Sequence, residues 1–281
     1  MKNDVFTIYN SCFPDYQTTS YWFQSLLKPE SAHIIYSYHE GRIVGFSMIH
    51  GNSITLICVI DDYRNNGYGS RMLKESEEYI KAKLPSADTI ILGRGKHYLL
   101  QGVPVEGCKA VSYFEKRGYS AKWTSVNMSL SLNHFHPDTI AIPPKPETVE
   151  FRLAVLSDMN GLLEAVSDAE PSWRGVFDSC IDPVMLSVQK GKIIGFQILS
   201  PNGGRFSPQN GKVGCIGCVG VIHEAREKGV GRQMVVEGIN LLKKEGCISI
   251  ELRYVELVDW YKKVGFHITG SQWMGEKSIV C

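Results

Sequence analysis

The chain has 281 residues, of which 43% are hydrophobic, enough for one large or two ordinary domains with full cores. Its formal net charge of +1 gives no electrostatic reason to expect nonspecific binding to nucleic acid or to anionic membranes. No apolar run approaches the roughly 20 residues that span a bilayer, the N-terminus does not resemble a signal peptide, and the eight cysteines are scattered. We therefore expect a cytoplasmic protein with free thiols and with no nucleic-acid or membrane partner.

The first half of the chain predicts a mixed pattern of helices and strands. Helical periodicity is interrupted at Pro14 and Asp15, and Glu40 with Gly41 marks the turn of a hairpin. In chain order we expect helical pieces within 5–27, strands at 33–38, 42–49 and 53–60, a helix at 70–84, a strand at 89–92, a loop at 97–106, a helix at 108–117 and a strand at 119–130.

Residues 133–147 contain four prolines and lack periodicity, which predicts a linker. After this segment the pattern starts again. We expect a strand at 149–155, helices at 158–166 and 172–180, a hairpin with strands at 184–188 and 192–199, a long strand at 213–222, a helix at 230–245, a strand at 248–254, a short helix at 257–264 and a last strand from 266.

The two halves also share sequence. G-R-I-V-G-F, Gly41 to Phe46, returns 150 residues later as G-K-I-I-G-F, Gly191 to Phe196. Because other matching positions differ in offset, we expect loops of different length in two divergent copies of one domain. The predicted fold class is mixed α/β (α+β), with two domains that each hold a mixed, mostly antiparallel sheet flanked by helices. The predicted boundaries are 1–132, a linker at 133–147, and 148–281.

Each half has a glycine-rich turn between a predicted strand and a predicted helix. The first is R-N-N-G-Y-G-S, Arg64 to Ser70, and the second is R-E-K-G-V-G-R, Arg226 to Arg232. Such a turn leaves backbone N–H groups unpaired at a helix N-terminus, where the helix dipole also favours phosphate oxygens. Neither turn has the Lys-Ser/Thr pair of a P-loop or the G-x-G-x-x-G of a dinucleotide site. An ordinary strand-to-helix connection is the alternative.

On these motifs, each half resembles the GNAT (Gcn5-related) N-acetyltransferase family, whose acetyl-CoA motif R/Q-x-x-G-x-G/A follows a strand. The family also carries a short helix reading roughly Y-x-x-x-G-F/Y, which the second half has from Tyr261 to Phe266. The resemblance implies that acetyl-CoA is the co-substrate, with no metal. It implies that the strand backbone holds the pantetheine arm and that the turn surrounds the diphosphate. In the second half these residues are Val219, Val221, Arg226, Glu227, Lys228, Gly229, Val230, Gly231 and Arg232. In the first half they are Val59, Arg64, Asn66, Gly67, Gly69 and Ser70.

The reaction that the resemblance implies is attack of a primary amine on the acetyl thioester. Tyr261 matches the tyrosine that is the family's usual general acid, whereas the corresponding residue of the first half is Phe114, which has no proton to give. We therefore expect the second half to be catalytic. The first half either binds acetyl-CoA without turnover or has lost both capacities. Glu251 and Glu256 are the candidates for the base that deprotonates the amine.

Each of these residues also has a purely structural interpretation. Tyr261 could be an aromatic core residue, Glu251 and Glu256 could be solvated strand-end charges, and His223 is more typical of a turn than of a base. Cys215 and Cys218 resemble a metal pair, but no second pair accompanies them.

The function hypothesis from sequence is an N-acetyltransferase. The alternative is a non-catalytic module that binds acyl-CoA. The acceptor, a small molecule or a peptide, and the choice between monomer and homodimer stay open.

Overall fold

The computed structural model describes residues 2–106, 109–133, 135–136, 148–178, 180, 182–206 and 211–279. The chain forms two compact units. The first consists of Met1–Val126, Arg205–Pro208 and Gly270–Cys281, and the second of Asn127–Gly204 and Gln209–Thr269. Of the predicted linker, residues 134 and 137–147 lie outside the described residues. Within the described residues, no helix is long and apolar enough to cross a membrane.

The first unit is a mixed sheet with helices packed on it. Its strands run in the order β1-β2-β3-β4-β13, in which only β3 and β4 pair in parallel. Its elements are α1 (Lys2–Cys12), η1 (Pro14–Tyr16), α2 (Ser20–Leu27), β1 (His33–His39), β2 (Arg42–His50), β3 (Ser53–Val59), η2 (Asp61–Tyr63), α3 (Tyr68–Lys83), β4 (Thr89–Leu92), β5 (Val103–Pro104), α4 (Ala110–Glu115) and β13 (Glu276–Ser278).

The second unit repeats this plan. Its strands run in the order β12-β6-β11-β10-β9-β8-β7, in which β10 and β11 pair in parallel and β10, β9, β8 and β7 pair antiparallel in turn. Its elements are β6 (Thr124–Ser131), β7 (Val149–Leu153), η4 (Leu156–Asp158), α5 (Met159–Ala169), η5 (Pro171–Trp173), α6 (Arg174–Asp178), β8 (Val184–Gln189), β9 (Lys192–Ser200), β10 (Lys212–Val221), η6 (His223–Ala225), α7 (Val230–Lys244), β11 (Cys247–Val255), α8 (Val258–Lys262) and β12 (His267–Trp273).

The predicted fold class is confirmed, and the predicted elements match the observed ones closely. Two short strands were missed. The predicted loop at 97–106 contains β5, and the predicted last strand divides at Met274 and Gly275 into β12 and β13. Both missed strands are only two or three residues long and have no sequence alternation to reveal them.

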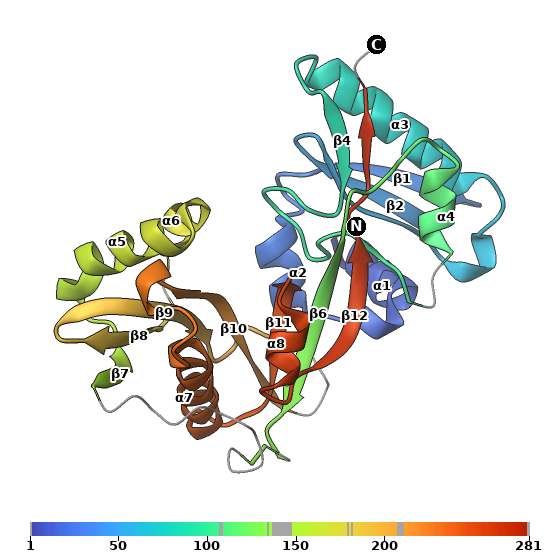
Figure 1. Cartoon of the computed structure of the whole chain (residues 1–281). Helices are drawn as coiled ribbons and strands as arrows, with labels where there is room; N and C mark the ends of the chain where they lie inside the picture. Colours follow the sequence, from blue (N-terminus) through green and yellow to red (C-terminus); the bar gives the residue numbers. More distant parts are fainter. Residues whose placement is uncertain are drawn as a thin grey trace. The chain divides into compact units, whose positions relative to one another are not determined.

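The C-terminal strand completes the sheet of the first unit. β13 pairs antiparallel with β4, and Figure 1 shows it in red beside that strand. Lys277 Nζ lies 3.0 and 2.9 Å from the two carboxylate oxygens of Glu77 on α3, and Arg94 donates to Met274 O at 3.0 Å. The long strands β6 and β12 each begin in one unit and end in the other. The units are therefore not simply the two halves of the sequence.

Helix α7 packs on the sheet of the second unit through a buried amide. Gln197 on β9 is fully buried, and its Nε2 donates to Met234 O on α7 at 2.6 Å. Gly238, one turn further along the helix, makes room for this side chain, because a Cβ there would lie 2.4 Å from Gln197 Nε2. Phe196, the preceding residue of β9, instead meets Phe177 of α6, with ring centroids 5.1 Å apart. Since successive strand residues face opposite sides, α7 and α6 cover opposite faces of the sheet.

The first unit makes the same junction with two hydroxyls. Ser47 on β2 lies 150 residues before Gln197, and its Oγ is 2.8 Å from Ser76 Oγ on α3. Ser76 in turn donates to Met72 O at 2.7 Å. The repeat thus preserves a polar link from sheet to helix while exchanging a serine pair for a glutamine and a glycine.

Candidate active site

In the second unit, strands β10 and β11 are paired only at their start. Their parallel register runs from Lys212 opposite Cys247 to Cys215 opposite Glu251. From Ile216 onward β10 continues to pair with β9 as far as Val221, but it has no register partner on β11 within the described chain. Val219 and Val221, the strand residues predicted to offer backbone groups, both lie in this one-sided segment.

A one-residue bulge lies in this same segment. Opposite β9, Gly217 faces Ile198 and Gly220 faces Phe196, so β10 uses one residue more than β9 between these pairs. Cys218, within the bulge, has a φ of 47°. This left-handed conformation is energetically unfavourable for any residue that has a side chain. Tyr254, near the end of β11, also has a left-handed φ, of 58°. Two such residues occur where the strands part.

The first unit has no bulge at the equivalent position. Strand β3 pairs with β2 without interruption from Met48 opposite Leu56 to Gly45 opposite Val59. The extra residue is therefore specific to the second unit. Because a bulge leaves backbone groups outside the ladder and turns the strand, it distinguishes the backbone surface of β10 from that of β3.

The two glycine turns have the same backbone conformation. Glu227 and Gly229 have φ values of 63° and 80°, and Asn65 and Gly67, which lie 162 residues earlier, have φ values of 62° and 83°. Gly229 and Gly67 are the N-caps of α7 and α3, and neither cap has a side-chain hydrogen bond. In the described chain, the N–H groups of residues 227–231 donate to no protein acceptor. The turn therefore presents successive amides at the positive end of a 15-residue helix.

The arginine that begins each turn is directed at the preceding strand. Arg226 donates from Nε to Val221 O at 3.0 Å and from Nη2 to Ala169 O at 3.1 Å. Arg64 donates from Nε to Val59 O at 2.9 Å and pairs with Asp61 at 2.7 Å. These guanidinium groups fix the end of the strand to the turn, so neither arginine side chain is directed away from the protein at the turn's unpaired amides.

Tyr261 lies on α8, close to the bulge. Its ring meets the edge of Phe266 at 5.8 Å, and the thiols of Cys218 and Cys215 are the ionisable groups beside its hydroxyl. Burial, aided by these two thiols, raises the pKa of Tyr261 well above its ordinary value. The hydroxyl is therefore protonated at neutral pH and can donate a proton.

The first unit repeats this aromatic pair with the hydroxyl on the other ring, where Tyr119 donates it to Glu77 at 3.0 Å. Phe114, which corresponds to Tyr261, is 5% exposed and meets the edge of Tyr119 at 5.6 Å. The neighbouring Tyr113 points its hydroxyl at the turn, 3.5 Å from where a Cβ of Gly69 would be. In the second unit the ring of Trp260 lies at this place, with its Cζ2 atom 3.5 Å from where a Cβ of Gly231 would be. The cluster is conserved between the units, and the proton donor is not.

The remaining candidates from the sequence occupy different settings. Glu251 forms an ion pair with Arg253 at 3.0 Å and is largely buried. Glu256 is exposed and forms no ion pair within the part of the chain that the structure describes. His223 is exposed, and its backbone N–H donates to Asp168 Oδ1 at 2.7 Å. The same oxygen lies 3.1 Å from His223 Nδ1. These contacts separate Glu256 from the other two, whose polar groups already have protein partners.

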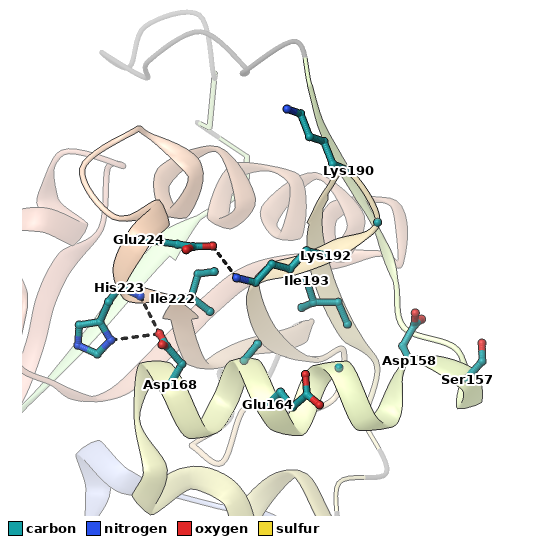
Figure 2. Close-up of a pocket in the computed structure, with 13 residues that line it drawn as sticks. Ser157, Asp158, Glu164, Asp168, Lys190, Lys192, Ile193, Ile222, His223 and Glu224 are labelled. Atoms are coloured by element: carbon teal, nitrogen blue, oxygen red, sulfur yellow. Dashed lines mark hydrogen bonds and ion pairs between the residues drawn. The ribbon is translucent and has the colours of Figure 1, made fainter.

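Beside the second turn, a cavity of about 790 Å³ lies between α5 and the hairpin of β8 and β9. Figure 2 shows two polar contacts at its edge, hydrogen bonds between His223 and Asp168 and an ion pair between Lys192 and Glu224. Lys192 Nζ lies 2.6 Å from Glu224 Oε1. Both pairs hold η6, the segment that leads into the turn, to elements on either side of it.

Among the described residues, no cluster of three or more His, Cys, Asp or Glu side chains is arranged to hold a metal ion. Cys215 and Cys218 are neighbours of Tyr261. Strand alternation predicts opposite orientations for residues three apart, but Cys218 lies in the bulge, where that alternation is broken.

The model of the acetyltransferase (GNAT) family matches this chain twice, at residues 2–119 and 148–266. The chain belongs to this family. A mycothiol acetyltransferase of Amycolatopsis mediterranei (strain U-32) is 26% identical, over 81% of this chain and 78% of that protein.

Solved structures share the fold. A GCN5-related glucosamine N-acetyltransferase region of a fungal multi-domain GH3 β-N-acetylglucosaminidase superposes with a TM-score of 0.80 at 22% identity, covering 98% of this chain and 36% of that one. A tandem GNAT protein from the clavulanic acid biosynthesis pathway superposes with a TM-score of 0.73 at 11% identity, covering 100% and 96%. The GNAT resemblance of both halves and the tandem arrangement are thereby confirmed.

Proposed function

We propose that the second unit transfers the acetyl group of acetyl-CoA to a primary amine. Membership of the GNAT family supports acyl transfer, and the family normally uses acetyl-CoA. The observation that carries the assignment to this unit is Tyr261, a partly buried and protonated tyrosine on α8 near the point where β10 and β11 part. Phe114 in the first unit offers no such proton.

The residues of the second unit fit acetyl-CoA, which supplies the acetyl thioester. The amides of residues 227–231 suit the diphosphate, since glycine lets the backbone approach without a Cβ in the way. The side of β10 that has no partner on β11, including Val219 and the N–H of Val221, suits the amide groups of the pantetheine arm, while the Val221 carbonyl accepts from Arg226 Nε. Tyr261 is the proposed general acid that protonates the departing thiolate.

Glu256 is our candidate for the general base. An alkyl amine is mostly protonated at neutral pH, so a base is needed, often acting through a water molecule. Glu251 is the alternative, but its negative charge is already compensated by Arg253 at 3.0 Å. The exposed Glu256 carboxylate has no such partner within the described residues.

The first unit, which the sequence places at 1–132, retains the turn without the acid or the bulge. We propose that it transfers no acetyl group. Acyl-CoA binding without turnover is the second candidate function for this unit. It is favoured by the φ angles of Asn65 and Gly67, which match those of Glu227 and Gly229 in the second turn.

The acceptor is the open part of the proposal. Two of the similar proteins are described as a mycothiol acetyltransferase and as a glucosamine N-acetyltransferase region. Glucosamine is therefore the first amine to test, followed by amino acids, polyamines and peptide N-termini.

The test is release of the CoA thiol on incubating the whole chain with acetyl-CoA and this amine panel. We expect Tyr261→Phe to lower kcat by about 10²-fold or more with at least one amine. Tyr113→Phe is the matched control, since it removes a tyrosine hydroxyl from the corresponding helix of the first unit, and it is expected to leave kcat unchanged. Full activity of Tyr261→Phe would refute the acid assignment, and no activity with any amine would favour the binding module.

A further inference from the structure

The last turn of α5 contacts both ends of η6, the short helix that leads into the second glycine turn. At the start of η6, the backbone N–H of His223 donates to Asp168 Oδ1 at 2.7 Å, and His223 Nδ1 lies 3.1 Å from the same oxygen. Just after η6, Arg226 Nη2 donates to Ala169 O at 3.1 Å. Since Asp168 and Ala169 are the last two residues of α5, one helix end fixes both ends of the segment.

Helix α5 is itself fixed on the sheet of the second unit. Leu162, Ala165 and Val166 of this helix are buried in one apolar cluster. The same cluster contains Ile222, which precedes η6, and Val230, which begins α7 after the turn. The helix end that contacts η6 is therefore held by packing against residues on both sides of the turn.

The Asp168 carboxylate contributes to η6 and not to its own helix. A negative charge in the last turn of a helix opposes the helix dipole. The pKa of Asp168 is nevertheless lowered, first by the hydrogen bond from the His223 N–H and then by the His223 ring. The contact of Lys192 with Glu224 joins two exposed side chains, and such pairs contribute little to stability. Asp168 instead binds the backbone of η6 directly.

The first unit fixes the corresponding segment in another way. Asp61, which lies 162 residues before His223, takes its place at the start of η2. The Asp61 carboxylate pairs with Arg64 at 2.7 Å, so the contact stays within the segment itself. In the second unit the carboxylate comes from α5. The support of the second turn by a separate helix thus accompanies the unit that has Tyr261.

We propose that Asp168 is a positioning residue for acetyl-CoA, acting through His223 on the amides of the second turn. These amides, of residues 227–231, begin four residues after His223 and donate to no acceptor in the described chain. They bind a diphosphate best when their directions are fixed before the ligand arrives. The inference rests on the proposed function, in which the diphosphate of acetyl-CoA binds here. Because Asp168 takes no part in the proton transfer assigned to Tyr261, it affects binding and not the chemical step.

The experiment compares the whole wild-type chain with Asp168→Ala and Asp168→Asn. Calorimetric titration measures the Kd of acetyl-CoA, and thiol release with the best amine of the panel measures kcat and the KM for acetyl-CoA. We expect Asp168→Ala to raise Kd and KM about tenfold, the scale of one hydrogen bond to a charged group, and to leave kcat unchanged. Asparagine can offer its side-chain oxygen to the same N–H, so Asp168→Asn should stay within about threefold of the wild-type Kd. The Asp168 side chain is 49% exposed, so neither replacement opens a cavity in the core.

Glu164→Ala is the matched control. Glu164 lies one turn earlier on α5 and lines the same cavity, as Figure 2 shows, but it has no hydrogen bond or ion pair among the described residues. Its removal should leave the Kd of acetyl-CoA within about twofold of the wild-type value.

Three results would overturn the positioning role while the proposed function stands. They are an unchanged Kd in Asp168→Ala, an Asp168→Asn chain that binds as weakly as Asp168→Ala, and a Glu164→Ala chain that binds as weakly as Asp168→Ala. A fall in kcat at saturating acetyl-CoA with KM unchanged would also contradict it. A wild-type chain that binds no acetyl-CoA would overturn both the positioning role and the proposed function.

Discussion

Gly238 is required by the side chain that faces it, so Gly238→Ala is expected to destabilise the second unit. The new Cβ would lie 2.4 Å from Gln197 Nε2 and 2.9 Å from Leu199 Cδ2. Gln197 is fully buried and donates to Met234 O, so moving its amide breaks a buried hydrogen bond. An unsatisfied buried group costs about 1–3 kcal/mol, and overpacking costs about as much again. The helix preference for alanine returns about 0.5–1 kcal/mol.

The net loss is about 1–5.5 kcal/mol, or roughly 2–4 °C in Tm for each kcal/mol in a protein of this size. Urea and thermal unfolding followed by circular dichroism measure it. Gly175→Ala is the matched control, because it adds the same methyl group to a helix at a place with nothing within 4 Å. Combining Gly238→Ser with Gln197→Ser recreates the Ser47 and Ser76 pair of the first unit and should recover stability. A Gly238→Ala chain as stable as the wild type would refute this reasoning.

Four further outcomes are expected. Because burial raises the pKa of Tyr261, kcat measured by thiol release should show no decline between about pH 7 and 10; a decline with a midpoint near 10 would contradict the acid role. Deleting Cys218 removes the bulge and should lower kcat by about 10²-fold, while an active deletion variant would show that the bulge is dispensable. Asp158, whose pKa Arg152 lowers to about 2, stabilises the fold above its unfolded pKa near 4. Asp158→Ala should therefore cost about 1–2 kcal/mol at pH 7, and its difference from wild type in urea unfolding should shrink as pH falls toward 2; a difference independent of pH would contradict this. Truncation after Gly275 removes β13, so hydrogen exchange in β4 should accelerate, and unchanged protection would be the contrary result.

The sequence predicts those features whose causes are local. Both glycine turns were predicted because glycine is the residue that adopts a φ near 80° without strain, as Gly67 and Gly229 do. The helices and hairpins follow from apolar periodicity over short stretches. The difference between Phe114 and Tyr261 is also visible from the sequence alone, since it needs only the alignment of the two halves.

Features that depend on pairing between distant segments could not be predicted. The bulge at Cys218 lies in a run of small and apolar residues without a clear alternation to reveal the extra one. The polar strand Glu276–Ser278 gives no sign that its partner is β4, nearly 190 residues earlier. The sequence indicates Glu251 as a possible base, but it does not reveal the ion pair that Glu251 forms with Arg253.

The position of β13 has a consequence for the synthesis of this protein. A sheet can be completed only when its last strand has left the ribosome, and domains generally fold in the order in which they are made. Here the first unit takes a strand from residues 276–278 of a chain that has 281 residues. The helices and other strands of the first unit are thus translated early, yet its sheet cannot be completed until residues 276–278 have left the ribosome. The first unit therefore waits for a strand that is made only after residues 127–204 and 209–269 of the second unit.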